Sequence, residues 1–74
     1  MEEIVVNQVK KFRAQRGLTQ AELAEKCDVT RECINHIENG KCGISLRLAM
    51  NICKTFGLKI EDVFTLVEVD ETET

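Results

Sequence analysis

Residues 17–41 read GLTQAELAEKCDVTRECINHIENGK, and this segment carries the clearest structural signals in the chain. Thr19 and Glu22 have the spacing of a capping box, in which each side chain accepts a hydrogen bond from the other residue's free backbone amide. Leu18 precedes the cap and Leu23 takes the fourth helical position, which is the pattern of a hydrophobic staple. The stretch therefore predicts a helix over residues 20–27.

A second helix is predicted after a turn of only Asp28 and Val29. Thr30 can cap this helix, and Gly40 takes the position where glycine commonly ends one, which predicts a helix over residues 31–39. Aspartate tolerates a left-handed backbone in such a turn better than most residues do. Two short helices joined in this way are typical of a helix-turn-helix, whose second helix enters the major groove of DNA.

The helix predicted over residues 31–39 has two unlike faces. At about 100° per residue, Cys33, Ile34 and Ile37 form an apolar arc that should face the core. The opposite arc holds only side chains that can form hydrogen bonds, and it lacks the Lys–Glu pairs common on surface helices. This polar arc consists of Arg31, Glu32, Asn35, His36 and Asn39.

Base edges in the major groove can be recognised by the first four members of this arc. Arginine pairs with guanine through two hydrogen bonds, and glutamate accepts from the amino group of cytosine. Each has an alternative role, because Arg31 can instead contact a phosphate, Glu32 can favour the positive end of the helix dipole and His36 can be a solvated surface residue. The pattern alone leaves these alternatives open.

Three more helices and two strands are predicted outside this stretch. Asn7 can cap a helix that ends near Arg16, Ser45 can cap a helix over residues 46–56, and a short helix follows over residues 60–64. β-Branched and apolar runs predict strands over residues 4–6 and 65–69. We expect one domain over residues 1–74, with a helical core over 7–64 and an acidic tail over 70–74.

Three segments carry a close resemblance to a known family: residues 17–24, 29–31 and 37–41. Over roughly residues 7–64 the chain resembles the Cro-like phage repressor (XRE-type) helix-turn-helix family. Its shortest similar members are compact homodimeric repressors such as the cytolysin repressor. The resemblance implies an all-α, five-helix, lambda-repressor-like DNA-binding domain with a small two-stranded antiparallel β-ribbon formed by the chain termini. Many relatives have glycine at the position of Asp28 and proline at that of Ile44.

The resemblance also implies roles for matching residues. Gln20 matches a phosphate and sugar contact, and Arg13 and Glu38 match a partly buried ion pair that ties the first helix to the third. Asn39 and Lys41 match backbone contacts after the recognition helix. The DNA-binding set expected from the pattern and the resemblance together is Gln20, Thr30, Arg31, Glu32, Asn35, His36, Asn39 and Lys41.

The net charge of −3 is unusual for a nucleic-acid-binding domain, which is commonly basic. Four acidic side chains lie in the last seven residues, so residues 1–67 carry a net charge of +1. A nearly neutral body should bind DNA weakly without regard to sequence. We therefore expect directed contacts to supply a larger share of the affinity.

The four cysteines show no spacing typical of a metal site or a thioredoxin-type motif. Cys27 and Cys53 fall in apolar helical registers, so we expect them to be buried and reduced. Cys33 and Cys42 are left as candidates for a redox sensor, since one lies in the first turn of a helix and the other in a loop. The single histidine and the absence of a Ser-His-Asp set indicate no enzyme. No metal, cofactor or small-molecule effector is expected.

The two terminal strands raise the question of a partner. An isolated two-stranded ribbon is marginal in water, and Leu66 and Val67 point to opposite faces of a strand, so a monomer would leave one of them exposed. They could fold back onto the first helix of their own chain, but pairing with a second copy would bury both faces and place two half-sites about 34–36 Å apart. The predicted dimer interface consists of Ile4, Val6, Leu66, Val67 and Val69.

These features predict a homodimeric, sequence-specific regulator of transcription, a repressor that binds double-stranded DNA at a palindromic operator. The alternative is the antitoxin or protein-interaction module of a toxin–antitoxin system, although antitoxins usually carry an added neutralising segment and only the short tail is available. No apolar run approaches the roughly 20 residues that cross a bilayer, and the acidic start of the chain is unlike a secretory signal. A cytoplasmic location with no membrane contact is therefore expected.

Overall fold

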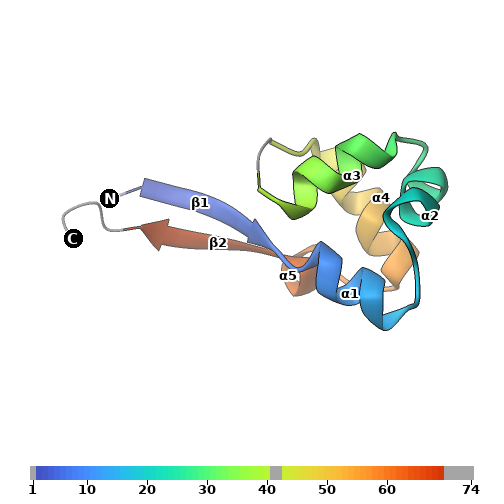
Figure 1. The fold of residues 1–74 in the computed structure, drawn as a ribbon. Helices are drawn as coiled ribbons and strands as arrows, with labels where there is room; N and C mark the ends of the chain where they lie inside the picture. The colour runs from blue at the N-terminus through green and yellow to red at the C-terminus, as the bar shows by residue number, and fades with distance from the viewer. Residues whose placement is uncertain (1, 41–42, 70–74) are drawn as a thin grey trace.

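The computed structural model describes residues 2–40 and 43–69, so Lys41, Cys42 and the predicted tail at 70–74 lie outside the described residues. Five helices stand between two strands, which confirms the predicted mostly helical fold with a terminal ribbon (Figure 1). No helix in the described part of the chain is long and apolar enough to cross a membrane. The elements are β1 (Glu2–Asn7), α1 (Val9–Gln15), α2 (Gln20–Cys27), α3 (Arg31–Glu38), α4 (Leu46–Phe56), α5 (Ile60–Val63) and β2 (Phe64–Val69).

The capping signals around α2 and α3 are formed as predicted. The Thr19 hydroxyl accepts from the Glu22 amide at 3.0 Å, and the Glu22 carboxylate accepts from the Thr19 amide at 2.9 Å. The bond from the Thr19 backbone amide to the carboxylate is the largest cause that lowers the pKa of Glu22. Asp28 adopts the left-handed conformation with φ of 59°, and the Thr30 hydroxyl accepts from the Cys33 amide at 3.1 Å. Local side-chain bonds therefore set where both helices begin, and the left-handed backbone of Asp28 turns the chain between them.

The core draws on every helix of the body. Each of the five helices contributes one side chain that is 0% exposed, namely Val9, Leu23, Ile34, Ile52 and Val63. Full burial of such an aliphatic side chain stabilises a fold by about 1.5–3 kcal/mol. Since α3 supplies Ile34 to this cluster, its orientation is determined by the same packing that stabilises the domain.

The ribbon formed by β1 and β2 extends away from the helices (Figure 1). The strands pair antiparallel, with Ile4 opposite Val67 and Asn7 opposite Phe64. Both strands are longer than predicted, because backbone pairing continues through Glu2, Glu3, Asn7 and Phe64, residues outside the predicted strands. For the same reason α5 ends one residue early, since Phe64 already belongs to β2.

The start of α1 also differs slightly from the prediction. Gln8 takes the N-cap position and makes no side-chain cap bond. Asn7 lies one residue earlier, yet its carboxamide oxygen accepts from the Val9 amide at 3.1 Å. Asn7 therefore performs the expected capping bond from the last position of β1.

Candidate nucleic-acid interface

The two arcs of α3 lie in different environments. Ile34 and Ile37 are 0% and 3% exposed, which confirms that the apolar arc faces the core. Cys33 is half-buried beside them. On the other arc four of the predicted DNA-contacting residues are exposed, and Asn35 is half-buried; the four are Arg31, Glu32, His36 and Asn39.

Arg13 and Glu38 lie together as an ion pair between α1 and α3. The Arg13 Nε donates to Glu38 Oε2 at 2.7 Å and Nη2 to Glu38 Oε1 at 3.3 Å. The Arg13 side chain is 14% exposed and that of Glu38 only 3%. A third donor of Arg13 reaches the Leu18 carbonyl oxygen at 2.7 Å. The pair therefore joins α1, α3 and the turn that leads into α2.

Gln20 links this pair to the middle of α3. Its side-chain amide donates to Glu38 Oε1 at 3.0 Å and to Asn35 Oδ1 at 3.3 Å. The buried carboxylate of Glu38 thus accepts from a guanidinium and from an amide, which offsets the cost of removing its charge from water. The start of α2 is consequently held against α3 by directed polar contacts as well as by apolar packing.

Asn35 is engaged more closely within the protein than the helical pattern implied. Its Oδ1 also accepts from the Asn39 side-chain amide at 3.0 Å, and Asn39 donates further to the Asn35 carbonyl oxygen at 2.9 Å. The Asn35 NH₂ group makes no hydrogen bond to any described residue. Asn35 can therefore offer a donor to a ligand, while its oxygen is already occupied.

Sequence reasoning did not foresee the linked set of Arg13, Glu38, Gln20, Asn35 and Asn39. The resemblance named the first two as a pair and Gln20 and Asn39 as separate DNA contacts, and the helical pattern added Asn35. The spacing of Gln20 and Glu38 carries no local signal, because the two residues meet only after α2 packs on α3. The signal available was the run of short amides on one helix face.

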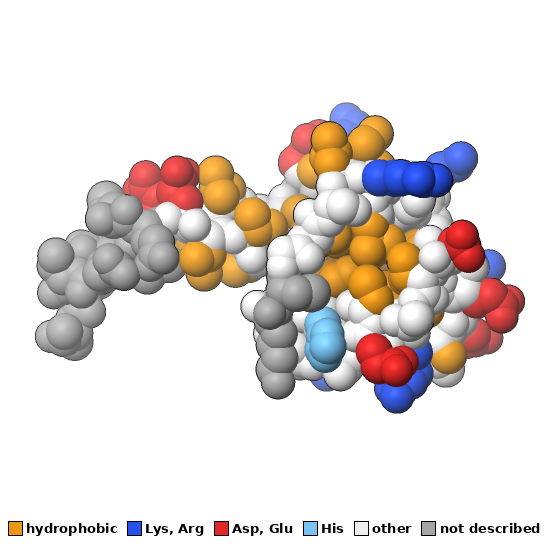
Figure 2. All heavy atoms as spheres, turned by 90° about the horizontal axis from the view of Figure 1, so that it is seen from above, with side chains coloured by type: hydrophobic (Ala, Val, Ile, Leu, Met, Phe, Trp, Pro, Cys, Tyr) orange, Lys and Arg blue, Asp and Glu red, His pale blue; other side chains and the backbone are white. Residues whose placement is uncertain are grey.

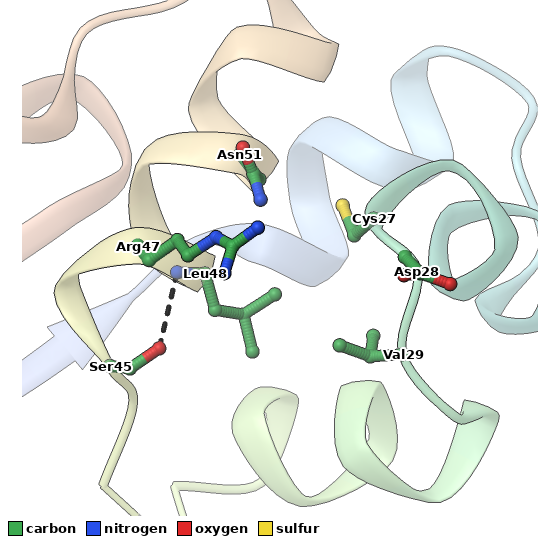
Figure 3. Close-up of a pocket in the computed structure, with 7 residues that line it drawn as sticks. All are labelled: Cys27, Asp28, Val29, Ser45, Arg47, Leu48 and Asn51. Carbon is green, nitrogen blue, oxygen red and sulfur yellow. Dashed lines mark hydrogen bonds between the residues drawn. The ribbon is translucent and has the colours of Figure 1, made fainter.

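A shallow open pocket of about 260 Å³ lies where the turn after α2 meets the start of α4 (Figure 3). Cys27 and Asp28 line it from one side, and Arg47 and Asn51 from the other. Burial raises the pKa of the Cys27 thiol, although its contact with the Thr55 hydroxyl acts in the opposite direction. The pocket therefore holds no activated thiol.

Cys53 is buried in the core at 3% exposure, as predicted, and burial raises the pKa of its thiol as well. The nearby charge of Asp62 acts in the same direction. Within residues 2–40 and 43–69, no three histidine, cysteine or acidic side chains gather as a metal site would require. The exposed arc of α3 is thus the feature that best fits a binding role.

Comparison with known proteins places this geometry in a family. The sequence pattern of a helix-turn-helix family, HTH_3, matches residues 9–63. The chain is 51% identical over 65 residues to an uncharacterized HTH-type transcriptional regulator of Methanocaldococcus jannaschii, covering 88% of this chain and 97% of that protein. It is 48% identical over 62 residues to the uncharacterized HTH-type transcriptional regulator YgzD of Bacillus subtilis, covering 84% and 94%.

A solved structure gives the same architecture. The crystal structure of the clp gene regulator ClgR from Corynebacterium glutamicum superposes with a TM-score of 0.70 at 31% identity. The match covers 73% of this chain and 57% of that one, so the chain spans little more than half of the regulator's length. The likeness concerns the part of the fold that the two structures share.

Proposed function

This chain belongs to the helix-turn-helix family HTH_3, and from that premise we propose that it is a sequence-specific regulator of transcription that binds double-stranded DNA. In finer terms, we propose a homodimeric repressor of a palindromic operator. Its arrangement would then be lambda-repressor-like, close to that of Cro-like phage repressors and of compact homodimers such as the cytolysin repressor. Residues 1–74 would act as a single domain.

The observation that carries this proposal is the exposed polar arc on a helix whose other face is buried. Ile34 and Ile37 anchor α3 in the core, so the exposed side chains of this helix are presented by a rigid element. A short helix with one exposed polar face fits the major groove, which admits an α-helix. Arg31, Glu32 and His36 are then assigned to base edges, with Asn35 supplying its free NH₂ group.

The remaining predicted contacts are assigned to the DNA backbone. Gln20 begins α2, where the free amides of a helix N-terminus favour a phosphate. Thr30 is exposed at the cap of α3, and its hydroxyl can still donate although its oxygen accepts from the Cys33 amide. Asn39 and Lys41 complete the set after the recognition helix. Such contacts fix the register of the protein on the duplex without specifying its sequence.

Dimer formation is supported by the apolar surface of the ribbon. Ile4, Val6, Leu66 and Val67 are 44%, 40%, 62% and 37% exposed. These side chains are proposed to pack on the same residues of a second copy, while the side chain of Val69, the fifth residue of the predicted interface, lies outside the described part of the structure. Two such domains related by a two-fold axis would read two half-sites one helical turn apart, which accounts for the palindrome.

Selection of bound duplexes from a random pool tests the proposal. We expect a two-half-site sequence to emerge, and Arg31→Ala to weaken its binding by about 1–3 kcal/mol while relaxing preference at one base pair. Lys54→Ala serves as the control, because Lys54 is an exposed cation in the last turn of α4, outside the predicted DNA-binding residues. Equal weakening on every sequence would instead identify Arg31 as a phosphate contact, and failure to select any sequence would refute the proposal.

A second candidate is an antitoxin or other protein-interaction module, which the exposed apolar ribbon also favours. In that case the ribbon would meet a different protein rather than a second copy. Co-expression with the product of the adjacent gene distinguishes the two. A stable one-to-one complex formed through the ribbon, with no self-association of the chain alone, would favour the module.

A further inference from the structure

Asn7 connects the ribbon to the recognition helix. It is the last residue of β1, and its side-chain amide donates to the carbonyl oxygen of Ile37 in the last turn of α3 at 2.9 Å. Its Oδ1 accepts from the Val9 amide at 3.1 Å. The two partners require this orientation of the carboxamide, because the Ile37 carbonyl can only accept and the Val9 amide can only donate.

No other side chain of the described ribbon forms a hydrogen bond to the helices. The apolar side chains farther along the ribbon are 37–62% exposed, so packing on the body does little to hold them. Figure 2 shows these hydrophobic side chains standing clear of the helical body. At the base of the ribbon, Phe64 is opposite Asn7 and packs against the core. Apart from the backbone bond from the Gln8 amide to the Val63 carbonyl oxygen at 2.9 Å, one apolar contact and one hydrogen-bonded side-chain amide therefore hold the direction of the ribbon.

We propose that Asn7 is a positioning residue that sets the angle between the ribbon and α3, and so the separation of the two recognition helices in a dimer. This inference rests on the proposed homodimeric function. The ribbon would join the two copies and α3 would read the DNA. A residue that joins the ribbon to α3 then controls how the half-sites are spaced.

The length of the ribbon makes a small change of angle consequential. From Asn7 to Glu2 the strand spans about 17 Å, at about 3.4 Å per residue. A tilt of about 10° moves its end by about 3 Å, which is close to the rise of one base pair along the duplex. Because two copies contribute, even a modest loosening would blur the preferred spacing.

The contact with Ile37 can be separated from the helix cap. The Ile37 carbonyl oxygen also accepts from the Gly40 amide at 3.1 Å, so losing Asn7 does not leave it unpaired. Asn7→Asp keeps an oxygen for the Val9 amide but replaces the donor with a carboxylate that repels the carbonyl. Asn7→Ser keeps a cap oxygen without adding charge. The two variants together distinguish positioning from capping.

The test measures binding to the selected two-half-site duplex, to versions with one base pair added or removed between half-sites, and to a single half-site. We expect the unsubstituted chain to lose about tenfold in affinity for each altered spacing, because the DNA must deform. For Asn7→Asp and Asn7→Ser this penalty should fall to about threefold or less. Single half-site affinity should stay unchanged.

Ser45→Ala is the matched control, because it removes one cap bond, to the Leu48 amide at 3.2 Å, at a position outside both the ribbon and α3. It should keep the sharp spacing preference. An unaltered preference in both Asn7 variants would overturn the inference. So would equal weakening on all three kinds of duplex, since that reports a loss of folding alone.

A second measurement does not depend on DNA. Residual dipolar couplings of backbone amides in the full chain report whether β1, β2 and α3 share one alignment. We expect a single alignment for the unsubstituted chain and for Ser45→Ala, and a separate, weaker alignment of the ribbon in Asn7→Asp. A shared alignment in that variant would refute the positioning role even if the DNA-binding proposal holds. Conversely, failure of the unsubstituted chain to bind any duplex would refute the proposed function without changing this result.

Discussion

Aliphatic side chains are buried in the helical body and exposed in the ribbon. In the body, Leu23 and Ile34 are both 0% exposed, whereas in the ribbon Ile4 and Leu66 are 44% and 62% exposed. Both regions are rich in aliphatic residues, so composition does not distinguish them. What differs is that five helices surround a common centre, whereas two strands have no second layer to pack against.

This difference indicates which region is complete within one chain. The body buries its apolar residues by itself, and no buried side-chain polar atom in the described residues lacks a partner. A two-stranded ribbon exposes both faces and both edges, which is marginal in water and invites pairing. The body therefore supplies a rigid surface for recognition, and the ribbon is the region whose apolar faces a partner could cover.

The largest difference in stability should appear when a leucine is replaced by alanine in the body and, in a separate variant, in the ribbon. Leu23→Ala should destabilise the chain by about 2–5 kcal/mol, because it opens a cavity in the core. Leu66→Ala should change stability by about 0.5 kcal/mol or less when measured at dilution. Denaturant unfolding of both variants gives the comparison. Equal losses would mean that the ribbon packs on the body within one chain.

A somewhat smaller loss of stability is expected at Glu38, the most buried member of the hydrogen-bonded network that links α1, α2 and α3. Glu38→Ala leaves Arg13 without its partner and should cost about 2–4 kcal/mol, near the lower end of what buried pairs show because Arg13 is partly exposed. Thermal melting against Glu25→Ala, an exposed glutamate on α2, measures it. If the two variants melt alike, the network does not stabilise the body.

A substitution in the ribbon should weaken the association of two copies of the chain. Leu66→Lys places a charge on the proposed dimer interface and should raise the dimer dissociation constant about tenfold or more, which is at least about 1.4 kcal/mol. Leu46→Lys alters a leucine of α4 that is 71% exposed, outside the ribbon, and should leave association unchanged. Sedimentation over a range of concentrations measures both. A monomeric unsubstituted chain, or a dimer unaffected by Leu66→Lys, contradicts the proposed interface.

The smallest effect should be the pH dependence of the α2 capping box. Because hydrogen bonds from Thr19 lower the pKa of Glu22 in the folded chain, its carboxylate stabilises the fold. That contribution is complete above the ordinary pKa of about 4.3 and is lost as the pH falls through the lowered value. Between about pH 5 and pH 3 the melting temperature of Glu22→Gln should therefore fall less than that of the unsubstituted chain. Parallel curves would show that the carboxylate has no such role.

Much of the body was predictable because its signals are local. The capping box at Thr19 and the Ser45 cap predicted where α2 and α4 begin, both helices have the predicted bounds, and the period of α3 predicted its buried face. Residues that pair within three or four positions need no tertiary information, since helical geometry alone brings them together. The terminal strands were predicted from their apolar character and their antiparallel pairing from the resemblance to the family, but the ends of the strands were not predicted.

Contacts between residues far apart in the chain could not be predicted from such local signals. Arg16 is an example, for its guanidinium lies 5.6 Å from the ring centre of Phe12 and 5.1 Å from that of Phe56, and it donates to the Phe56 carbonyl oxygen at 2.8 Å. The two phenylalanines are far apart in the chain. Nothing in the spacing of these residues indicates that the ends of α1 and α4 meet.

The helices, the left-handed turn at Asp28 and the separation of α3 into an apolar and a polar face follow from the amino-acid sequence alone, because they depend on backbone geometry and on neighbours within one helical turn. The bonds from the Gln20 amide to Glu38 and from Asn7 to Ile37 form only once the domain has packed. Those bonds join residues 18 and 30 positions apart. Their formation depends on the packing of whole elements, because a side-chain amide has many partners available until the core fixes which of them lies within about 3 Å.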